Sequence, residues 1–273
     1  METGRTAAAR ALLEKLAKSQ PHPYILGRLA HVAWRSGDHA AAERLFAAAQ
    51  GARPGDPVQA SWVAVQRAVF ERERGRFGEA KDLVARALTL RPAYHPAEEL
   101  QPEIERLAGD AAAAERSCRA LLAKGSAVEV SSTLADLLRA KGDAAQADRI
   151  LADTTRSYED LHTAFPEAVA RDLARFYMRH GRSLERAREL ARHAFADRQT
   201  AESLRVLGEA ELRAGALDNA SEAVTRALEM GDRTARLLLL ASKIRAAKGD
   251  ASDAATHRRE ALRLNPEVER LPP

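Results

Sequence analysis

One octapeptide recurs along this chain with two fixed residues, a glycine and, five positions later, an alanine. Residues 247–254 read AKGDASDA, residues 140–147 read AKGDAAQA, and looser copies occur elsewhere. The glycines that mark the copies are Gly37, Gly75, Gly109, Gly142, Gly181, Gly215 and Gly249. They are 38, 34, 33, 39, 34 and 34 residues apart. A period near 34 is typical of stacked helix–turn–helix units, so we expect a repeat array.

Each octapeptide is interpreted as the turn between two helices. Apolar residues at helical spacing precede the glycine, as Leu204, Leu207 and Leu212 precede Gly215, and a second helical run follows it. Glycine adopts the left-handed backbone conformation that ends a helix without a Cβ penalty. Aspartates directly after the glycine can cap the second helix by accepting a backbone N–H: Asp38, Asp110, Asp143 and Asp250.

Small side chains at two fixed positions predict that the paired helices approach closely. The first position is the alanine of the octapeptide: Ala42, Ala80, Ala114, Ala147, Ala220 and Ala254. The second lies seven residues before the glycine: Ala30, Ala68, Ala135, Ala174, Gly208 and Ser242. Because the distance between helix axes depends on the side chains at the contact, we expect these two positions to face each other.

Further residues repeat in the same register. Large residues lie four positions after the alanine: Phe46, Val84, Leu151 and Val224. A proline or polar residue closes several units: Pro54, Pro92, Asp232 and Pro266. With these residues and Tyr177, the chain resembles the tetratricopeptide repeat family. The resemblance implies an all-α fold, a solenoid with a right-handed superhelix.

We therefore expect one solenoid domain over residues 1–273, with about seven repeats. Their approximate ranges are 23–56, 61–94, 95–128, 128–161, 167–199, 201–234 and 235–268. Residues 6–20 are expected to form a lone helix that caps the N-terminal end, so the array starts in mid-repeat. Pro96 and Pro102 predict a short or kinked first helix in the third repeat. The segment 157–168 exceeds the period and predicts a deviation there.

The resemblance also implies that the first helix of each pair lines a concave groove. The residues expected to bind a peptide or a partner's helix in this groove are Tyr24, His31, Trp34, Arg35, Trp62, Arg72, Arg171, Arg175, Arg179 and Arg205. Both tryptophans have an alternative role, packing between neighbouring repeats. The row formed by Arg171, Arg175 and Arg179 also has an alternative, neutralisation by nearby acidic residues of the chain.

Sequence motifs for catalysis or metal binding are not found. The eight histidines are scattered without an HExxH motif, and no phosphate-binding, dinucleotide-binding or nucleophile-elbow motif occurs. The lone Cys118 falls on the expected buried face of its helix and is interpreted as a core thiol. We therefore expect neither an enzyme nor a cofactor. No apolar run reaches the roughly 18 residues of a membrane span, and cytoplasmic localisation is expected.

The leading functional hypothesis is a non-enzymatic protein–protein interaction module acting as scaffold, adaptor or assembly factor. The arginines favour a partner with an acidic segment or a terminal carboxylate. A nucleic-acid-binding array is a weaker alternative, because 43 cationic and 39 anionic side chains are interleaved rather than segregated. Two further alternatives stay open: a regulatory or sensor domain of a larger system, and self-association through an array end.

Overall fold

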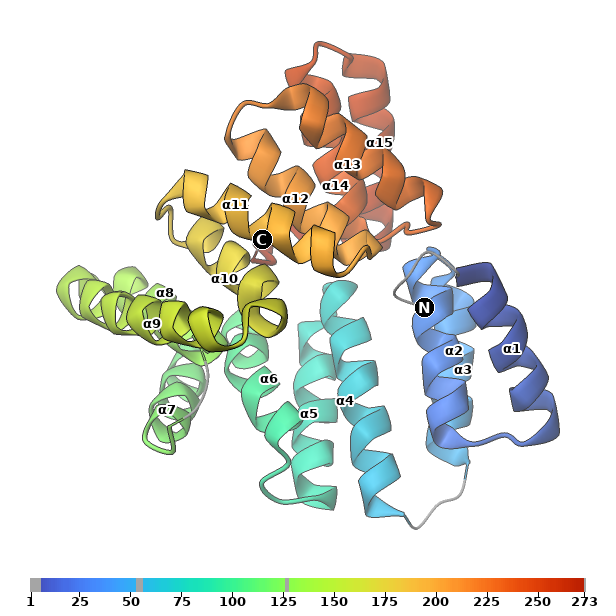
Figure 1. Cartoon of the computed structure of the whole chain (residues 1–273). Helices are drawn as coiled ribbons and strands as arrows, with labels where there is room; N and C mark the ends of the chain where they lie inside the picture. Colours follow the sequence, from blue (N-terminus) through green and yellow to red (C-terminus); the bar gives the residue numbers. More distant parts are fainter. Residues whose placement is uncertain (1–5, 53–55, 126–127, 273) are drawn as a thin grey trace. The chain divides into compact units, whose positions relative to one another are not determined.

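The described residues of the computed structural model, 6–52, 56–125 and 128–272, are helical throughout, with no strand among them (Figure 1). The helices are α1 (Thr6–Ser19), α2 (Pro23–Arg35), α3 (His39–Gly51), α4 (Pro57–Glu73), α5 (Phe77–Leu90), α6 (His95–Leu107), α7 (Ala111–Leu122), α8 (Val128–Ala140), α9 (Ala144–Ala164), α10 (Pro166–Arg179), α11 (Leu184–Asp197), α12 (Ala201–Arg213), α13 (Leu217–Glu229), α14 (Ala235–Ala247) and α15 (Ala251–Leu264), followed by the 3₁₀ helix η1 (Val268–Arg270). The all-α repeat fold predicted from the period is confirmed.

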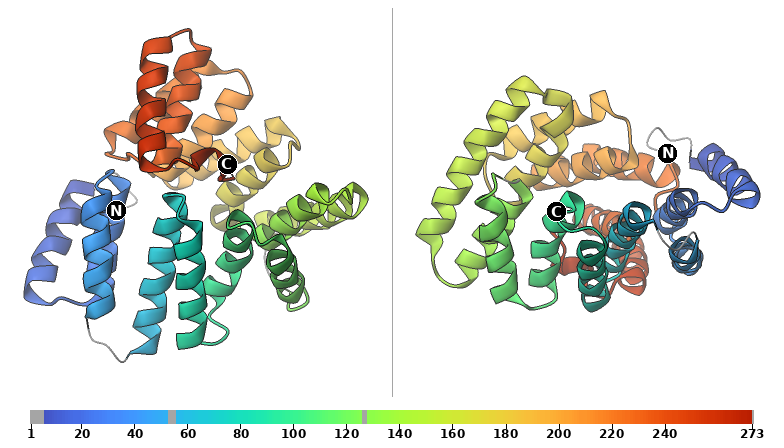
Figure 2. Two further views of the ribbon diagram at one scale, coloured as in Figure 1. Left: turned by 180° about the vertical axis from the view of Figure 1, so that it is seen from behind. Right: turned by 90° about the horizontal axis from the view of Figure 1, so that it is seen from below.

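Helices α2 to α15 form seven successive pairs, and α1 packs on α2 as the expected lone helix. Figure 2 shows one such pair, α8 with α9, side by side in two further views. The chain groups into two compact units. Unit 1 contains residues 1–52, 73–75 and 165–273, and unit 2 contains residues 53–72 and 76–164. That residues 1–273 form a single domain stays a prediction.

The turns have the chemistry expected from the octapeptide. Gly142 has φ +88° and Gly249 has φ +85°, the left-handed conformation that an L side chain rarely adopts. Each predicted aspartate caps its helix. In each cap the aspartate Oδ1 accepts a backbone N–H three residues later. The bonds are Ala41 N–H to Asp38 (2.9 Å), Ala113 N–H to Asp110 (3.1 Å), Gln146 N–H to Asp143 (3.0 Å) and Asp253 N–H to Asp250 (3.2 Å). The octapeptide therefore ends one helix and starts the next.

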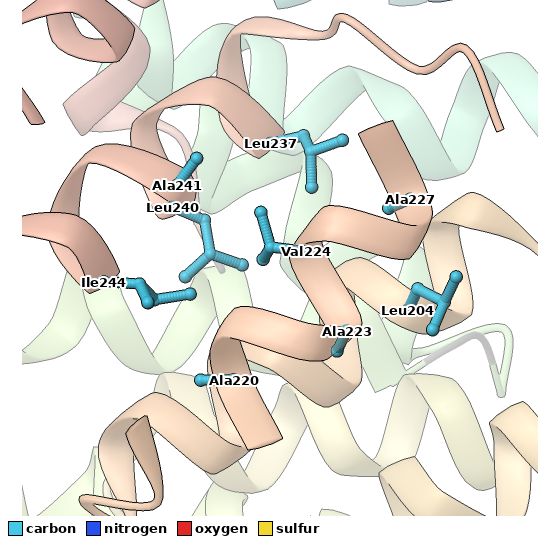
Figure 3. Packing of buried hydrophobic residues seen from close by; sticks show 9 residues of the cluster. All are labelled: Leu204, Ala220, Ala223, Val224, Ala227, Leu237, Leu240, Ala241 and Ile244. Atoms are coloured by element: carbon cyan, nitrogen blue, oxygen red, sulfur yellow. The ribbon is translucent and has the colours of Figure 1, made fainter. Parts of the chain in front are cut away.

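The small residues lie at the crossing of the paired helices, as predicted. A Cβ on Gly208 of α12 would lie 3.0 Å from Val224 Cγ2 of α13. Ser242 Oγ of α14 donates to the carbonyl oxygen of Ala254 in α15 at 2.8 Å, so this crossing is hydrogen-bonded. Figure 3 shows how the buried side chains of α12, α13 and α14 then fill one core, with Val224 directed toward Leu240.

The two segments that depart from the repeat pattern, around Pro102 and after the fourth repeat, are mostly helical. The third repeat's first helix, α6, is not shortened, because it spans 13 residues with Pro102 inside, the same length as α2 and α12. Pro96 lies in its first turn, where an N–H is not needed. Contacts with α5, α7 and α8 offset the bond lost at Pro102. The long segment after the fourth repeat extends α9 to 21 residues, and Pro166 starts α10. Pro54 lies outside the described residues.

The described helices include none long and apolar enough to cross a membrane.

Candidate partner-binding site

All the predicted groove residues lie on first helices of the pairs. Tyr24, His31, Trp34 and Arg35 are on α2, Trp62 and Arg72 are on α4, Arg171, Arg175 and Arg179 are on α10, and Arg205 is on α12. Trp62 and Arg72 belong to unit 2, and the other eight residues belong to unit 1. The two groups are therefore described separately.

In unit 1, two of the predicted arginines pair with one carboxylate, and the charge of a third acts on it. Arg205 Nη2 lies 2.8 Å from Glu202 Oε1, and Arg35 Nη1 lies 3.5 Å from Glu202 Oε2. Arg175 of α10 also acts on the charge of Glu202. We call Arg35, Arg175 and Arg205, with Glu202 between them, the arginine cluster. Its contact between Arg35 and Glu202 joins α2 to α12, which are far apart in sequence.

The charges of the arginine cluster determine the protonation of Glu202. Burial alone would raise the pKa of its carboxyl, but the charge and hydrogen bond of Arg205, with Arg35 and Arg175, hold that pKa well below its ordinary value. Burial would lower the pKa of Arg205, but the charge and hydrogen bond of Glu202 raise it. The Arg205 side chain is 4% exposed and that of Glu202 is 30% exposed. The cluster therefore stays fully ionised and is partly open to solvent.

The arginine row of α10 is partly neutralised from within the chain. Asp172 Oδ1 lies 3.5 Å from Arg171 Nε and 3.8 Å from Arg175 Nη1. One carboxylate thus faces two guanidinium groups whose side chains are 37% and 30% exposed. Asp172 therefore supplies the internal partner expected in the alternative, and both arginine side chains keep part of their surface exposed.

Arg35 also makes a contact that the sequence analysis missed. Its Nη2 pairs with Asp232, and its carbonyl oxygen accepts the Arg233 N–H at 2.7 Å. Asp232 lies between α13 and α14 and is only 3% exposed. Burial raises the pKa of its carboxyl, and the Arg35 charge opposes this. We call the contact among Arg35, Asp232 and Arg233 the seam. It joins the first repeat to the sixth and seventh repeats within unit 1.

The aromatic residues of α2 are placed for packing rather than exposure. Trp34 is buried, and its ring meets the His31 ring edge-on at 4.9 Å between centroids. This favours the packing alternative for Trp34. Tyr24 is half-buried, with its ring 5.4 Å from that of His22.

In unit 2, the two predicted residues of α4 are half-buried. Arg72 Nη1 lies 3.1 Å from Glu103 Oε1 of α6, so this arginine is paired within its unit. Trp62 keeps part of its surface exposed. Both assignments to a partner-binding surface stay predictions.

Known repeat proteins are similar to this chain in sequence or in fold. The family model described as tetratricopeptide repeat matches residues 1–64. A solved tetratricopeptide repeat protein from Parabacteroides merdae is similar with a TM-score of 0.51 and 17% sequence identity, over 88% of this chain and 93% of that chain. No curated protein sequence matches. The similarity to the solved structure supports a helical repeat fold, and the family model matches the N-terminal part of the chain.

Two further solved structures are similar to this chain at lower scores. One is from the APC/C hetero-tetramer Cut9–Hcn1, with a TM-score of 0.47, 15% identity, and coverage of 98% of this chain and 52% of that chain. The other is Pseudomonas aeruginosa PilF, with a TM-score of 0.40, 17% identity, and coverage of 78% and 97%. Tetratricopeptide repeats generally serve as noncatalytic protein–protein interaction modules.

Three buried glutamates were also missed by the sequence-based predictions. Glu71, Glu105 and Glu211 each lie four residues before a turn glycine, and all three are buried. Glu211 accepts from Arg188 Nη2 at 3.0 Å and from Arg192 Nε at 2.9 Å. It borders a hollow of about 170 Å³ lined by Arg192, Leu204, Leu207, Glu211, Asn219, Glu222, Ala223 and Arg226. The recurrence of glutamate in one register was the signal that could have found them.

The described residues contain no group of three or more histidine, cysteine or acidic side chains arranged to hold a metal ion. Cys118 is a buried free thiol, in agreement with its interpretation as a core residue.

Proposed function

We propose that this protein is a noncatalytic interaction module that binds an acidic peptide segment of a partner protein at the arginine cluster. The observation that carries the proposal is the pairing of Arg35 and Arg205 with the single carboxylate of Glu202, on which the charge of Arg175 also acts. Scaffold, adaptor and assembly roles in the cytoplasm are all consistent with such a contact.

The accessible arginines of unit 1 support an acidic ligand. The side chains of Arg35, Arg171 and Arg175 are 22%, 37% and 30% exposed, so solvent reaches all three. Guanidinium groups bind carboxylates through paired, charge-assisted hydrogen bonds. A ligand with spaced carboxylates would therefore contact the accessible guanidinium groups of Arg35, Arg171 and Arg175.

Binding of a fluorescently labelled poly-glutamate peptide to the full chain tests the proposal. Arg175→Ala should weaken the affinity by about ten-fold, the value of one hydrogen bond to a charged group. The matched control is Arg156→Ala, because Arg156 also pairs with an aspartate three residues before it, Asp153, but lies on α9 in unit 2. Affinity should also fall as salt is raised.

Two outcomes would contradict an acidic-peptide site. One is an equal effect of Arg175→Ala and Arg156→Ala on peptide affinity, which would reduce the interaction to general charge attraction. The other is displacement of the peptide by random single-stranded RNA at lower concentrations than by unlabelled peptide, which would favour the nucleic-acid alternative.

A further inference from the structure

Arg35 belongs to two structures at once. Its Nη1 faces Glu202 in the arginine cluster, and its Nη2 pairs with Asp232 in the seam. Glu202 of α12 and Asp232 of the α13–α14 turn therefore share the guanidinium of Arg35. A ligand that attracts the Arg35 guanidinium therefore weakens its contacts with both Glu202 and Asp232.

The seam is close-packed as well as charged. The Arg233 N–H donates to the Arg35 carbonyl oxygen, and a Cβ on Gly37 would lie 3.2 Å from Arg233 Cβ. Repeat arrays normally place each unit against its neighbours only. A contact between the first repeat and the turn after α13 thus depends on these few polar groups rather than on continuous helix packing.

Unit 1 holds a second contact of the same kind. Glu73 accepts from Arg236 Nε and Nη2 at 2.9 Å each, and its carbonyl oxygen accepts from Asn265 Nδ2 at 2.9 Å. Loosening of the seam therefore does not by itself detach residues 73–75 from the C-terminal repeats.

We propose that an acidic ligand at the arginine cluster competes with Asp232 for Arg35, so that ligand binding loosens the seam. The inference rests on the proposed function and adds regulation to the same site. A ligand carboxylate beside Arg35 brings a third negative charge close to Glu202 and Asp232, and like charges disfavour one another. The buried Asp232 carboxylate then loses its counter-charge, and opening of the turn to water relieves that cost.

Linkage makes the effect reciprocal. If the ligand loosens the seam, a weakened seam must increase the affinity for the ligand by the same factor. This gives two independent measurements, one at the seam and one at the ligand.

The first measurement is amide hydrogen exchange in the full chain with and without the poly-glutamate peptide. The Arg233 amide should exchange faster when the peptide is bound. The internal control is the Asp250 amide, which donates to the Arg245 carbonyl oxygen at 2.9 Å in the turn after α14, away from Arg35. Unchanged or slower exchange at Arg233 in the peptide-bound chain would overturn the inference.

The second measurement is peptide affinity of Asp232→Asn. Asparagine keeps the Oδ1 that accepts from the Thr234 N–H at 2.9 Å, so the start of α14 retains its acceptor. Affinity should rise about five-fold or more, within the usual range of coupling between two sites. Asp218→Asn is the control, because Asp218 is exposed and pairs with Lys248; its peptide affinity should not change.

Failure of the inference and failure of the proposed function give different results. If Arg175→Ala weakens peptide binding while Arg233 exchange and Asp232→Asn show no effect, the binding site stands and the coupling is wrong. If Arg175→Ala leaves peptide binding unchanged, the proposed function is wrong and the coupling with it. If Asp232→Asn does not fold, the amide hydrogen exchange of Arg233 in the unaltered chain, with and without peptide, still tests the coupling.

Discussion

At the scale of single residues, burial changes the chemistry of side chains that look ordinary in the sequence. Burial, together with the neighbouring charges of Arg35 and Arg28, lowers the pKa of His31 from 6.5 to about 4. Burial and Arg74 have the same effect on His39, whose pKa is also about 4. Both imidazoles are therefore neutral in the folded chain near neutral pH.

This predicts an acid-dependent loss of stability. Below pH 6.5 the unfolded chain takes up a proton on His31 that the folded chain does not, so the free energy of unfolding falls from pH 6.5 down to about 4, where the folded imidazole also protonates. His31→Gln should flatten this part of the profile. Urea unfolding at pH about 7 and about 5 measures it. His193→Gln, at an exposed position on α11, should follow the parent profile; equal flattening by both variants would contradict the assignment.

At the scale of elements, the helix pair is the unit that the chain repeats. Glycine and aspartate define the turn, and small residues set the distance between the two helices. Ala147 of α9 is fully buried, whereas Ala145, two residues earlier, is exposed. The same residue type therefore has two roles on one helix, depending on its face.

We predict that the face rather than the residue type determines tolerance to size. Ala147→Leu should lower the free energy of unfolding by about 1–3 kcal/mol, because added methyl groups overpack the crossing of α8 and α9. Ala145→Leu should change it by less than about 0.5 kcal/mol, as expected for a surface position. Chemical denaturation of both variants compares them. A neutral Ala147→Leu would mean that the two helices do not approach closely at this point.

At the scale of the whole molecule, unit 1 combines the two ends of the sequence. The first repeat belongs to it together with the fifth, sixth and seventh repeats, and the seam provides a contact between them. In a strictly linear array, a local defect affects its neighbours most and fades along the chain. Unit 1 departs from that rule.

We predict that a defect in the first repeat is transmitted to the turn after α13. Phe46→Ala removes a fully buried side chain of α3 and should cost about 3–5 kcal/mol locally. Exchange at the Arg233 amide should then be faster, because its acceptor is the Arg35 carbonyl oxygen of the same repeat. Leu151→Ala, a fully buried residue of unit 2 that is closer to Arg233 in sequence, should have a smaller effect. The reverse order would indicate a linear array.

The sequence by itself determined the local architecture. Turn glycines, aspartate caps and small crossing residues act within one helix pair, so a fixed spacing such as that of Gly208 and Ala220 is enough to specify them. The helix around Pro102 was the exception, since packing against three other helices offsets the missing hydrogen bond.

Only the tertiary structure decided which charges meet. Arg35 was predicted as a groove residue, but its partner Asp232 is 197 residues away and was interpreted as a closing residue of its repeat. Likewise, Trp34 is buried against its own repeat, although its position in the period suited a groove anchor. The sequence period identifies equivalent residues in successive repeats. Which distant turns come into contact depends on the small rotation between one repeat and the next, which accumulates along the array.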